Sequence, residues 1–257
     1  MTVKQVANVL DLLEFFAARG KPASLAEIAQ HFGWPRSSAF NLLSTLVERG
    51  YLYEPKRRGG YYPTPRWLAL AREISAAEPL PDEVPTLLRE LAKTTGETVW
   101  IASASGQHAV LLEVIQSEHA VRYTAEVGKR VPLHATATGQ AIISQMPETQ
   151  QASVLRKAVF ERYSEGTPMS IDAVEQSIRR SLARGWFESA SAFSHDLGGV
   201  SVPLVLDGRV FSLTVAGPLF RVRERMEEIA GALQSAVKRH LGADYFTKNV
   251  PNLATLP

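Results

Sequence analysis

Residues 24–62 contain two short segments with helical apolar periodicity, which a single glycine separates. Ser24, with Glu27 three residues later, predicts a capping box at the start of the first segment. Gly33 permits a sharp reversal of the chain, and Pro35 suits the first turn of a second helix that ends near Gly50. Two short helices joined in this way predict a helix-turn-helix.

The second helix of this unit has two unlike faces. Its apolar residues recur at intervals of three and four and predict one buried stripe: Ala39, Leu42, Leu43, Leu46 and Val47. Residues 51–64 then predict a hairpin with a basic Gly-Gly turn between aromatic-rich strands. A helix with short polar side chains beside a basic hairpin is the arrangement of a winged helix-turn-helix that reads DNA.

The start of the first helix, the exposed face of the second helix and the wing supply the candidate DNA contacts. They are Ser24, Arg36, Ser37, Ser38, Phe40, Asn41, Ser44, Lys56, Arg57 and Arg58. Asn41 is the best candidate base reader, because its amide can bond adenine N6 and N7 together. Phe40 has two readings, contact with a thymine methyl group or packing against the first helix. The three basic wing residues suit contacts with phosphates.

The charge distribution agrees with this reading. Residues 1–66 contain nine Lys and Arg and five Asp and Glu residues, a net charge of +4, whereas the whole chain carries +2. The basic charge is therefore concentrated in the N-terminal unit, where contacts with phosphates need it.

Composition excludes several other classes of protein. The chain has no cysteine, which excludes disulfides and thiolate chemistry. No apolar run approaches the ~20 residues that a membrane-spanning helix needs. Asp11 and Glu14 make the N-terminus a packed helix rather than a targeting segment. We therefore expect a cytoplasmic protein with no membrane partner.

The remaining elements predict an α+β protein in three parts: a winged helix-turn-helix domain over residues 1–64, a linker helix over 65–81 and a second domain over 82–257. A first helix over 2–18 would pack through Val6, Val9, Leu10, Leu13 and Phe16. In the second domain we predict strands over 98–104, 108–115, 121–127, 200–206 and 209–216. Helices are predicted over 82–95, 147–158, 171–184 and 221–240, with another following the loop that begins at 131 and a loosely held tail from 244.

The chain resembles the IclR family of bacterial transcriptional regulators along essentially its whole length. The resemblance rests on residues 24–52, 59–71, 127–144, 184–186 and 200–218, in the expected order and at the expected separations. It implies a winged-helix DNA-binding domain, a linker helix and a GAF-like α/β domain that binds an effector. It also implies a homodimer or homotetramer on a palindromic double-stranded DNA operator.

The resemblance further implies an effector pocket between the loop and helix at residues 132–139 and the facing sheet. Carried over position by position, its candidates are Tyr123, Val131, Ala137, Thr138, Ser189, Gly199, Thr214 and Ala216. His134 is added from the same loop, where it either hydrogen-bonds the loop or contacts an anionic effector. Because a helix N-terminus attracts oxygen atoms that carry negative charge, we expect a small anionic or oxygen-rich metabolite as the effector.

Three features depart from the family pattern. Ser191 or Ala192 lies near the position where the family usually has an acidic residue. Gly199 stands where the family has Cys or Ser, and Asn41 stands where it often has Arg. These departures leave the expected fold unchanged. They bear on the effector and on the operator sequence.

Two other classes of function remain as alternatives. In one, the C-terminal domain only oligomerises a DNA-binding protein; in the other, it is an enzyme and the N-terminal domain mediates docking. Ser194, His195 and Asp196 do not form a triad, because adjacent side chains on an extended chain point apart. The histidines lack the compact spacing of a zinc site, so we expect no metal and no cofactor.

Overall fold

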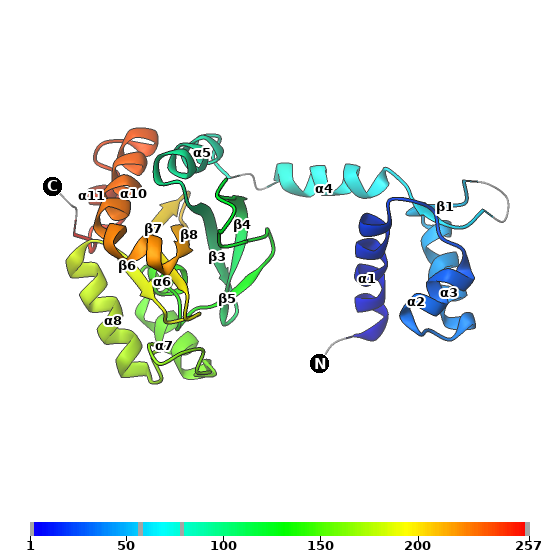
Figure 1. Ribbon diagram of the computed structural model, residues 1–257, viewed down its shortest axis with the longest axis horizontal. Coiled ribbons are helices and arrows are strands. Elements are labelled where there is room, and N and C mark those ends of the chain that lie inside the picture. Colours follow the sequence, from blue (N-terminus) through cyan, green and yellow to red (C-terminus); the bar gives the residue numbers. More distant parts are fainter. Residues whose placement is uncertain (1–2, 56–58, 78–79, 255–257) are drawn as a thin grey trace. The chain divides into compact units, whose positions relative to one another are not determined.

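The computed structural model describes residues 3–55, 59–77 and 80–254 (Figure 1). The chain divides into two compact units, residues 1–79 and residues 80–257. The first unit contains α1 (Lys4–Arg19), α2 (Leu25–Phe32), α3 (Arg36–Glu48), β1 (Leu52–Tyr53), β2 (Tyr62–Pro63) and α4 (Arg66–Ala77).

The helix-turn-helix forms for the reasons that the sequence suggests. The Ser24 hydroxyl accepts the Glu27 N–H at 3.3 Å, and the Glu27 carboxylate accepts the Ser24 N–H at 2.8 Å, which completes the capping box at α2. Gly33 ends α2 with φ 64°, a left-handed conformation that glycine adopts without steric cost. The core of this unit consists of Leu12, Phe16, Ala23, Ile28, Leu43, Leu46 and Leu52.

Two details of the predicted helix packing are wrong. In α1 the buried residues are Leu12 and Phe16, whereas Val6 and Leu10 are 60% and 56% exposed. Because α1 is apolar around much of its circumference, periodicity alone does not select its buried face; the Phe16 ring does so by packing edge-on against Tyr62. On α3, Val47 is 37% exposed and lies outside the buried stripe.

The second unit is built on a six-stranded antiparallel sheet with the strand order β5-β4-β3-β8-β7-β6. Its strands are β3 (Thr98–Ser105), β4 (His108–Ile115), β5 (Arg130–Pro132), β6 (Phe187–Ala190), β7 (Leu197–Leu206) and β8 (Arg209–Pro218). Asp207 and Gly208, both with positive φ, form the predicted tight turn between β7 and β8.

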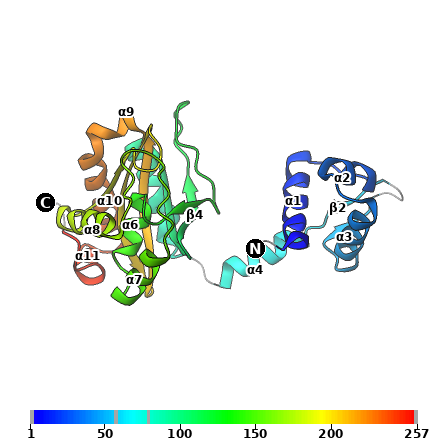
Figure 2. The same ribbon diagram turned by 90° about the horizontal axis from the view of Figure 1, so that it is seen from below.

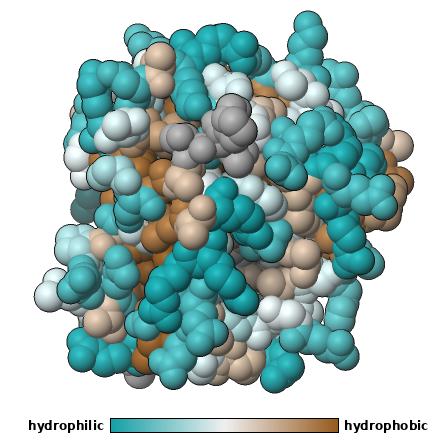
Figure 3. Space-filling view, turned by 90° about the vertical axis from the view of Figure 1, so that its left-hand side faces the viewer, coloured by the Kyte–Doolittle hydropathy of each residue, from teal (hydrophilic) through white to brown (hydrophobic). Residues whose placement is uncertain are grey.

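Helices cover this sheet. They are α5 (Glu83–Thr95), α6 (Ala137–Ile143), α7 (Glu148–Lys157), α8 (Ile171–Arg184), α9 (Leu219–Val222), α10 (Met226–Leu241) and α11 (Tyr245–Asn249), with a 3₁₀ turn at Arg223–Arg225. α5 and α10 pack against each other and against the sheet, and α6 packs on β7 and β8. Figure 3 shows one face of the second unit, on which hydrophilic residues predominate and apolar residues are visible among them. No helix within the described part of the chain is long and apolar enough to cross a membrane.

The structure corrects the predicted strands and the predicted long helix. Residues 121–127 form no strand; the chain joins the sheet only at β5, which takes the edge of β4 over His108–Val110. β6 is a strand that the sequence did not predict. The helix predicted over 221–240 is broken into α9, a 3₁₀ turn and α10, because Arg221 and Arg225 turn back toward Glu97 and the Thr95 carbonyl.

The tail is also more firmly held than predicted. In α11 the Tyr245 and Phe246 side chains are buried, and the Tyr245 hydroxyl bonds both the N–H and the C=O of Val205, at 2.8 and 2.9 Å. The pairing of β6 with β7 stops at Ser201, so no neighbouring strand bonds Val205 on that side. The Tyr245 hydroxyl makes the two hydrogen bonds that such a strand would make. Burial raises the pKa of Tyr245 to about 12.

A buried ion pair joins the start of β3 to α9. The Glu97 side chain is fully buried, and the Arg221 guanidinium donates to both of its carboxylate oxygens. Arg221 also donates to the Val121 carbonyl at 3.0 Å. A carboxylate at this depth needs such a partner, since burial of an unpaired charge is strongly unfavourable.

We therefore expect Arg221→Ala to lower the free energy of unfolding by about 3–5 kcal/mol, because it leaves Glu97 buried without a cation. Chemical denaturation followed by circular dichroism measures this change. Arg179→Ala removes an exposed ion pair with Glu175 and serves as the control, with an expected change below about 0.5 kcal/mol. Equal effects of the two substitutions would contradict the assignment.

Candidate functional site: a helix face and a cavity

The N-terminal unit presents most of its candidate DNA contacts on one exposed surface. Arg36, Ser37, Ser38, Phe40 and Asn41 are exposed on α3, and Ser44 is half-buried there. Phe40 is 50% exposed, so its ring is available to a partner. The candidates Lys56, Arg57 and Arg58 lie outside the described residues.

Ser24 differs from the other candidates. Its hydroxyl accepts the Glu27 N–H and also donates to the Glu27 carboxylate at 2.9 Å, so both of its hydrogen-bonding roles serve the helix cap. Its hydroxyl is therefore not free to bond DNA, and the prediction of a DNA contact rests only on the position of Ser24 at the start of α2.

A groove beside α3 brings in residues that sequence reasoning missed. Its α3 wall includes Ser38, Asn41 and Thr45, and the facing wall is formed by Lys4, Gln5 and Asn8 of α1. Lys4, Gln5 and Asn8 are polar residues of the first helix, and their spacing could have indicated a shared polar face. The incorrect prediction of the buried face of that helix hid this pattern.

In the second unit, strand register brings distant residues together in two rows on one face of the sheet. In the first row Ser189 pairs with Gly199, Gly199 with Ala216, and Ala216 with Thr98. Two residues further along each strand, the second row contains Ser201, Thr214 and Trp100. Positions two apart face the same side of a sheet.

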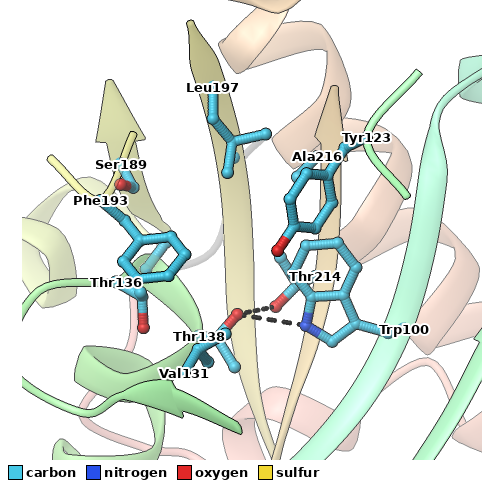
Figure 4. Close-up of a pocket in the computed structure, with 12 residues that line it drawn as sticks. Trp100, Tyr123, Val131, Thr136, Thr138, Ser189, Phe193, Leu197, Thr214 and Ala216 are labelled. Atoms are coloured by element: carbon cyan, nitrogen blue, oxygen red, sulfur yellow. Dashed lines mark hydrogen bonds between the residues drawn. The ribbon is translucent and has the colours of Figure 1, made fainter. Parts of the chain in front are cut away.

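The helix α6 lies over these rows and covers a small cavity of about 30 Å³ between itself and the sheet (Figure 4). Its lining comprises Trp100, Tyr123, Val131, Thr136, Ala137, Thr138, Ser189, Phe193, Leu197, Gly199, Thr214 and Ala216. Eight of the nine effector candidates are in this set, and His134 is not. None of the twelve lining residues carries a charge.

A chain of hydrogen bonds runs along the floor of the cavity. The Trp100 indole donates to the Thr138 hydroxyl at 3.2 Å, Thr138 bonds Thr214 at 2.9 Å, and Thr214 bonds Ser201 at 2.7 Å. Thr138 is therefore tied to the sheet rather than free at the helix start. Among the described residues, the hydroxyls of Tyr123 and Ser189 have no hydrogen-bond partner, and Figure 4 shows the Tyr123 hydroxyl pointing into the cavity.

Two glycines shape the cavity in different ways. Gly139 in α6 lies directly on the Leu133 backbone, where a Cβ atom would come within 2.3 Å of the Leu133 Cα atom. A Cβ atom at Gly199 would meet the Ala216 Cβ at 3.3 Å, a tight contact that a small shift relieves. Position 139 therefore excludes any side chain, whereas position 199 leaves space that a small side chain would partly fill.

The sequence analysis did not predict Thr136, Phe193, Leu197 or Trp100 as lining residues. Thr136 is the N-cap of α6, with its hydroxyl accepting the Gly139 N–H at 3.0 Å. Leu197 could have been found, because it stands two residues before Gly199 on the same strand. Phe193 lies in a loop, where no periodicity indicates its direction. Trp186 lies in the core, under the guanidinium of Arg184.

His134 belongs to a separate buried cluster. It is 4% exposed, its ring packs on Phe160 and Tyr163, and its Nε2 atom has no hydrogen-bond partner among the described residues. Burial lowers the pKa of His134, against the opposing influence of Glu161, and neighbouring His108 lowers it further. A neutral, packed histidine favours the structural reading of this residue over contact with an effector.

No group of three or more His, Asp or Glu residues within the described ranges is placed to hold a metal ion.

A lowered pKa in the folded state means that the unfolded chain binds more protons below about pH 6.5. We therefore expect the free energy of unfolding to fall between pH 7 and pH 5, by at most about 1.4 kcal/mol per pH unit from His134. In His134→Gln this loss should be smaller, as measured by urea denaturation at both pH values. His195→Gln, at an exposed position, is the control; His108 is retained in both variants. A pH dependence unchanged by His134→Gln would show that this residue does not titrate on unfolding.

Comparison with known proteins agrees with this geometry in both units. Residues 5–55 match the family described as IclR helix-turn-helix domain, and residues 78–240 match Bacterial transcriptional regulator IclR C-terminal. The acetate operon repressor of Salmonella typhimurium is 25% identical over 241 residues, which cover 92% of this chain and 88% of the relative.

Solved structures share the fold. The IclR protein of Thermotoga maritima superimposes with a TM-score of 0.76 at 21% identity, covering 93% of this chain and 99% of that one. An IclR homologue from Microbacterium hydrocarbonoxydans, crystallised with 4-hydroxybenzoate, gives a TM-score of 0.66 at 22% identity, covering 91% and 99%.

Proposed function

The chain belongs to the IclR family of bacterial transcriptional regulators, and on that premise we propose that its C-terminal cavity binds a small effector which alters operator occupancy. The observation that carries this proposal is the convergence of eight family-derived candidates on one cavity. They come from β5, β6, β7, β8, α6 and the segment before β5, and chance does not gather such positions around a single space.

The proposed effector is a small anionic or oxygen-rich metabolite. Trp100, Tyr123 and Phe193 offer aromatic surface to its body, and the free hydroxyls of Tyr123 and Ser189 can bond its oxygen atoms. Because the lining carries no charge, an anion would be held by hydrogen bonds alone. This favours a single weakly charged group over a polyanion.

A screen of small carboxylic acids, lactones and phenols by thermal shift tests this proposal directly. A compound that binds the native state must raise the melting temperature. 4-Hydroxybenzoate is a reasonable first member of the screen, since a protein of the same fold has been crystallised with it.

The N-terminal unit is proposed to read the operator through α3, with Asn41 as the base reader. Asn41 is exposed between the α3 face and the groove shared with α1, so a base edge can approach its amide. Lys4 lies across the same groove and suits an adjacent phosphate. Lys56, Arg57 and Arg58 are proposed as phosphate contacts of the wing. A homodimer or homotetramer on a palindromic operator remains part of this proposal.

Asn41→Ala should weaken operator binding by about 1–3 kcal/mol and leave binding to unrelated DNA nearly unchanged, because a base contact contributes only at the correct sequence. Gel shifts with the operator and with scrambled DNA measure both affinities. Gln30→Ala, at an exposed position on α2, is the control. An equal loss on both DNAs would make Asn41 a backbone contact, and no loss would remove it from the interface.

Thr138→Leu should abolish the effector response while operator binding persists, because the larger side chain fills the cavity and cannot continue the hydrogen-bonded chain from Trp100. Operator release is titrated with the compound found in the screen. Thr138→Val, which keeps the volume, should weaken the response less. Thr149→Leu, on an exposed face of α7, should respond normally. A normal response in Thr138→Leu would place the effector site elsewhere.

Two alternatives give different results. If the C-terminal unit only oligomerises, no compound will shift the melting temperature or release DNA. If it is an enzyme, metabolites will be turned over. The names of the relatives, which are regulators and repressors, favour a role without catalysis.

A further inference from the structure

Residues 121–127 supply one wall residue of the cavity, Tyr123, and are not part of the sheet. This segment lies in the connection from β4 to β5, which Figure 2 shows in green as a long extended excursion at the edge of the second unit. Within the described residues, no backbone hydrogen bond joins residues 121–125 to another strand. The sheet's own bonding therefore does not hold the wall that carries Tyr123.

Side chains hold this segment instead. The Thr98 hydroxyl donates to the Tyr123 carbonyl at 2.7 Å, and the Gln116 amide donates to the Ala125 carbonyl at 3.1 Å. The Thr98 hydroxyl also accepts the Ser117 N–H at 3.1 Å, so its orientation is set. Carbonyls of alternate residues in an extended chain point to the same side, so side chains on that side can donate hydrogen bonds to each of them in turn.

The third anchor is Arg221. Its guanidinium donates to the Val121 carbonyl at 3.0 Å while it pairs with the buried carboxylate of Glu97. The carbonyls of residues 121, 123 and 125 thus all accept hydrogen bonds from side chains, which belong to α9, to β3 and to the residue that follows β4.

The Tyr123 ring separates the cavity from the Lys129 side chain. Inside the cavity the Tyr123 ring lies 5.7 Å from the Trp100 ring, and on its other contact the Lys129 ammonium lies 4.8 Å from its centre. Val121 and Val127 are 62% and 65% exposed. Displacing the segment would break a few hydrogen bonds and expose the Tyr123 ring and the buried Ala125 methyl group, a smaller cost than breaking the ladder of backbone hydrogen bonds that holds the sheet.

We propose that residues 121–127 are the movable wall through which the effector enters and leaves the cavity, and that Thr98, Gln116 and Arg221 are the positioning residues that keep it closed. This inference takes the cavity to be the effector site, as proposed above. Each anchor then sets the fraction of time for which the wall is open, and with it the rates of effector entry and release.

The lack of cysteine makes a direct test possible, because one introduced thiol is unique. Ala216→Cys places it in the cavity wall, beside Tyr123 and opposite the space left by Gly199 (Figure 4). The rate of modification by methyl methanethiosulfonate, measured by mass spectrometry without effector or DNA, then reports how often the wall opens. The full-length chain is used throughout.

Thr98→Val and Gln116→Ala in this background should each label roughly two- to tenfold faster, because each removes one hydrogen bond to a carbonyl of the wall, that of Tyr123 or Ala125. Gln150→Ala, at an exposed position in α7, should label at the parent rate. Gln116 is itself exposed, so its variant keeps the test valid if Thr98→Val fails to fold. The melting temperature of Gln116→Ala should fall by no more than about a few degrees, as the loss of one hydrogen bond implies, so that global unfolding stays too rare to account for the labelling.

Three results would overturn the inference: no acceleration in a folded anchor variant, equal acceleration in Gln150→Ala, or a parent thiol that reacts as fast as in the denatured chain. Because the assay contains no effector, it is independent of the proposed function. If the wall opens but no compound in the screen binds, the movable wall stands and the proposed effector site is contradicted. If a compound binds but the anchor variants label at the parent rate, the effector site stands and the movable wall is contradicted.

Discussion

The antiparallel register of β3, β8, β7 and β6 is the constraint on which the second unit depends. It aligns Ser189, Gly199 and Ala216 in one row and Ser201, Thr214 and Trp100 in the next, although these residues are spread over more than half of the domain's length. A shift by one residue in any strand would turn its members to the other face, where α5 and α10 pack. The position of the cavity is therefore determined by strand pairing, and the side chains determine only its lining.

The N-terminal helix-turn-helix was predictable because its signals are local. A cap, a glycine reversal and a periodic stripe act within about ten residues of one another, and Ser24, Gly33 and Leu43 play the predicted parts. The buried face of α1 was not predictable in this way, since the packing of Phe16 on Tyr62 depends on residues more than forty positions apart. The same reason explains β6, a four-residue strand that exists only through its pairing with β7.

For the cavity, the sequence alone would have given little. Eight lining residues were available only because family resemblance carries information about long-range pairing. Residues 121–127 show the limit of local pattern: their composition suits a strand, but β5 takes the edge of β4 and leaves them to be anchored by side chains. His134 was close to the pocket in sequence and is separated from it in space, because it packs on Phe160 and Tyr163.

The two glycines of the cavity divide it into a part that cannot vary and a part that can. At Gly139, the backbone contact with Leu133 leaves no space for any other amino acid, so the corner between β5 and α6 has a fixed shape. On the opposite side, the contact at Gly199 is tight by only a few tenths of an ångström, and the neighbouring Ser189 and Ala216 are small. Exchange of small residues on the strands would therefore change the shape of the cavity, whereas the corner between β5 and α6 would keep its shape.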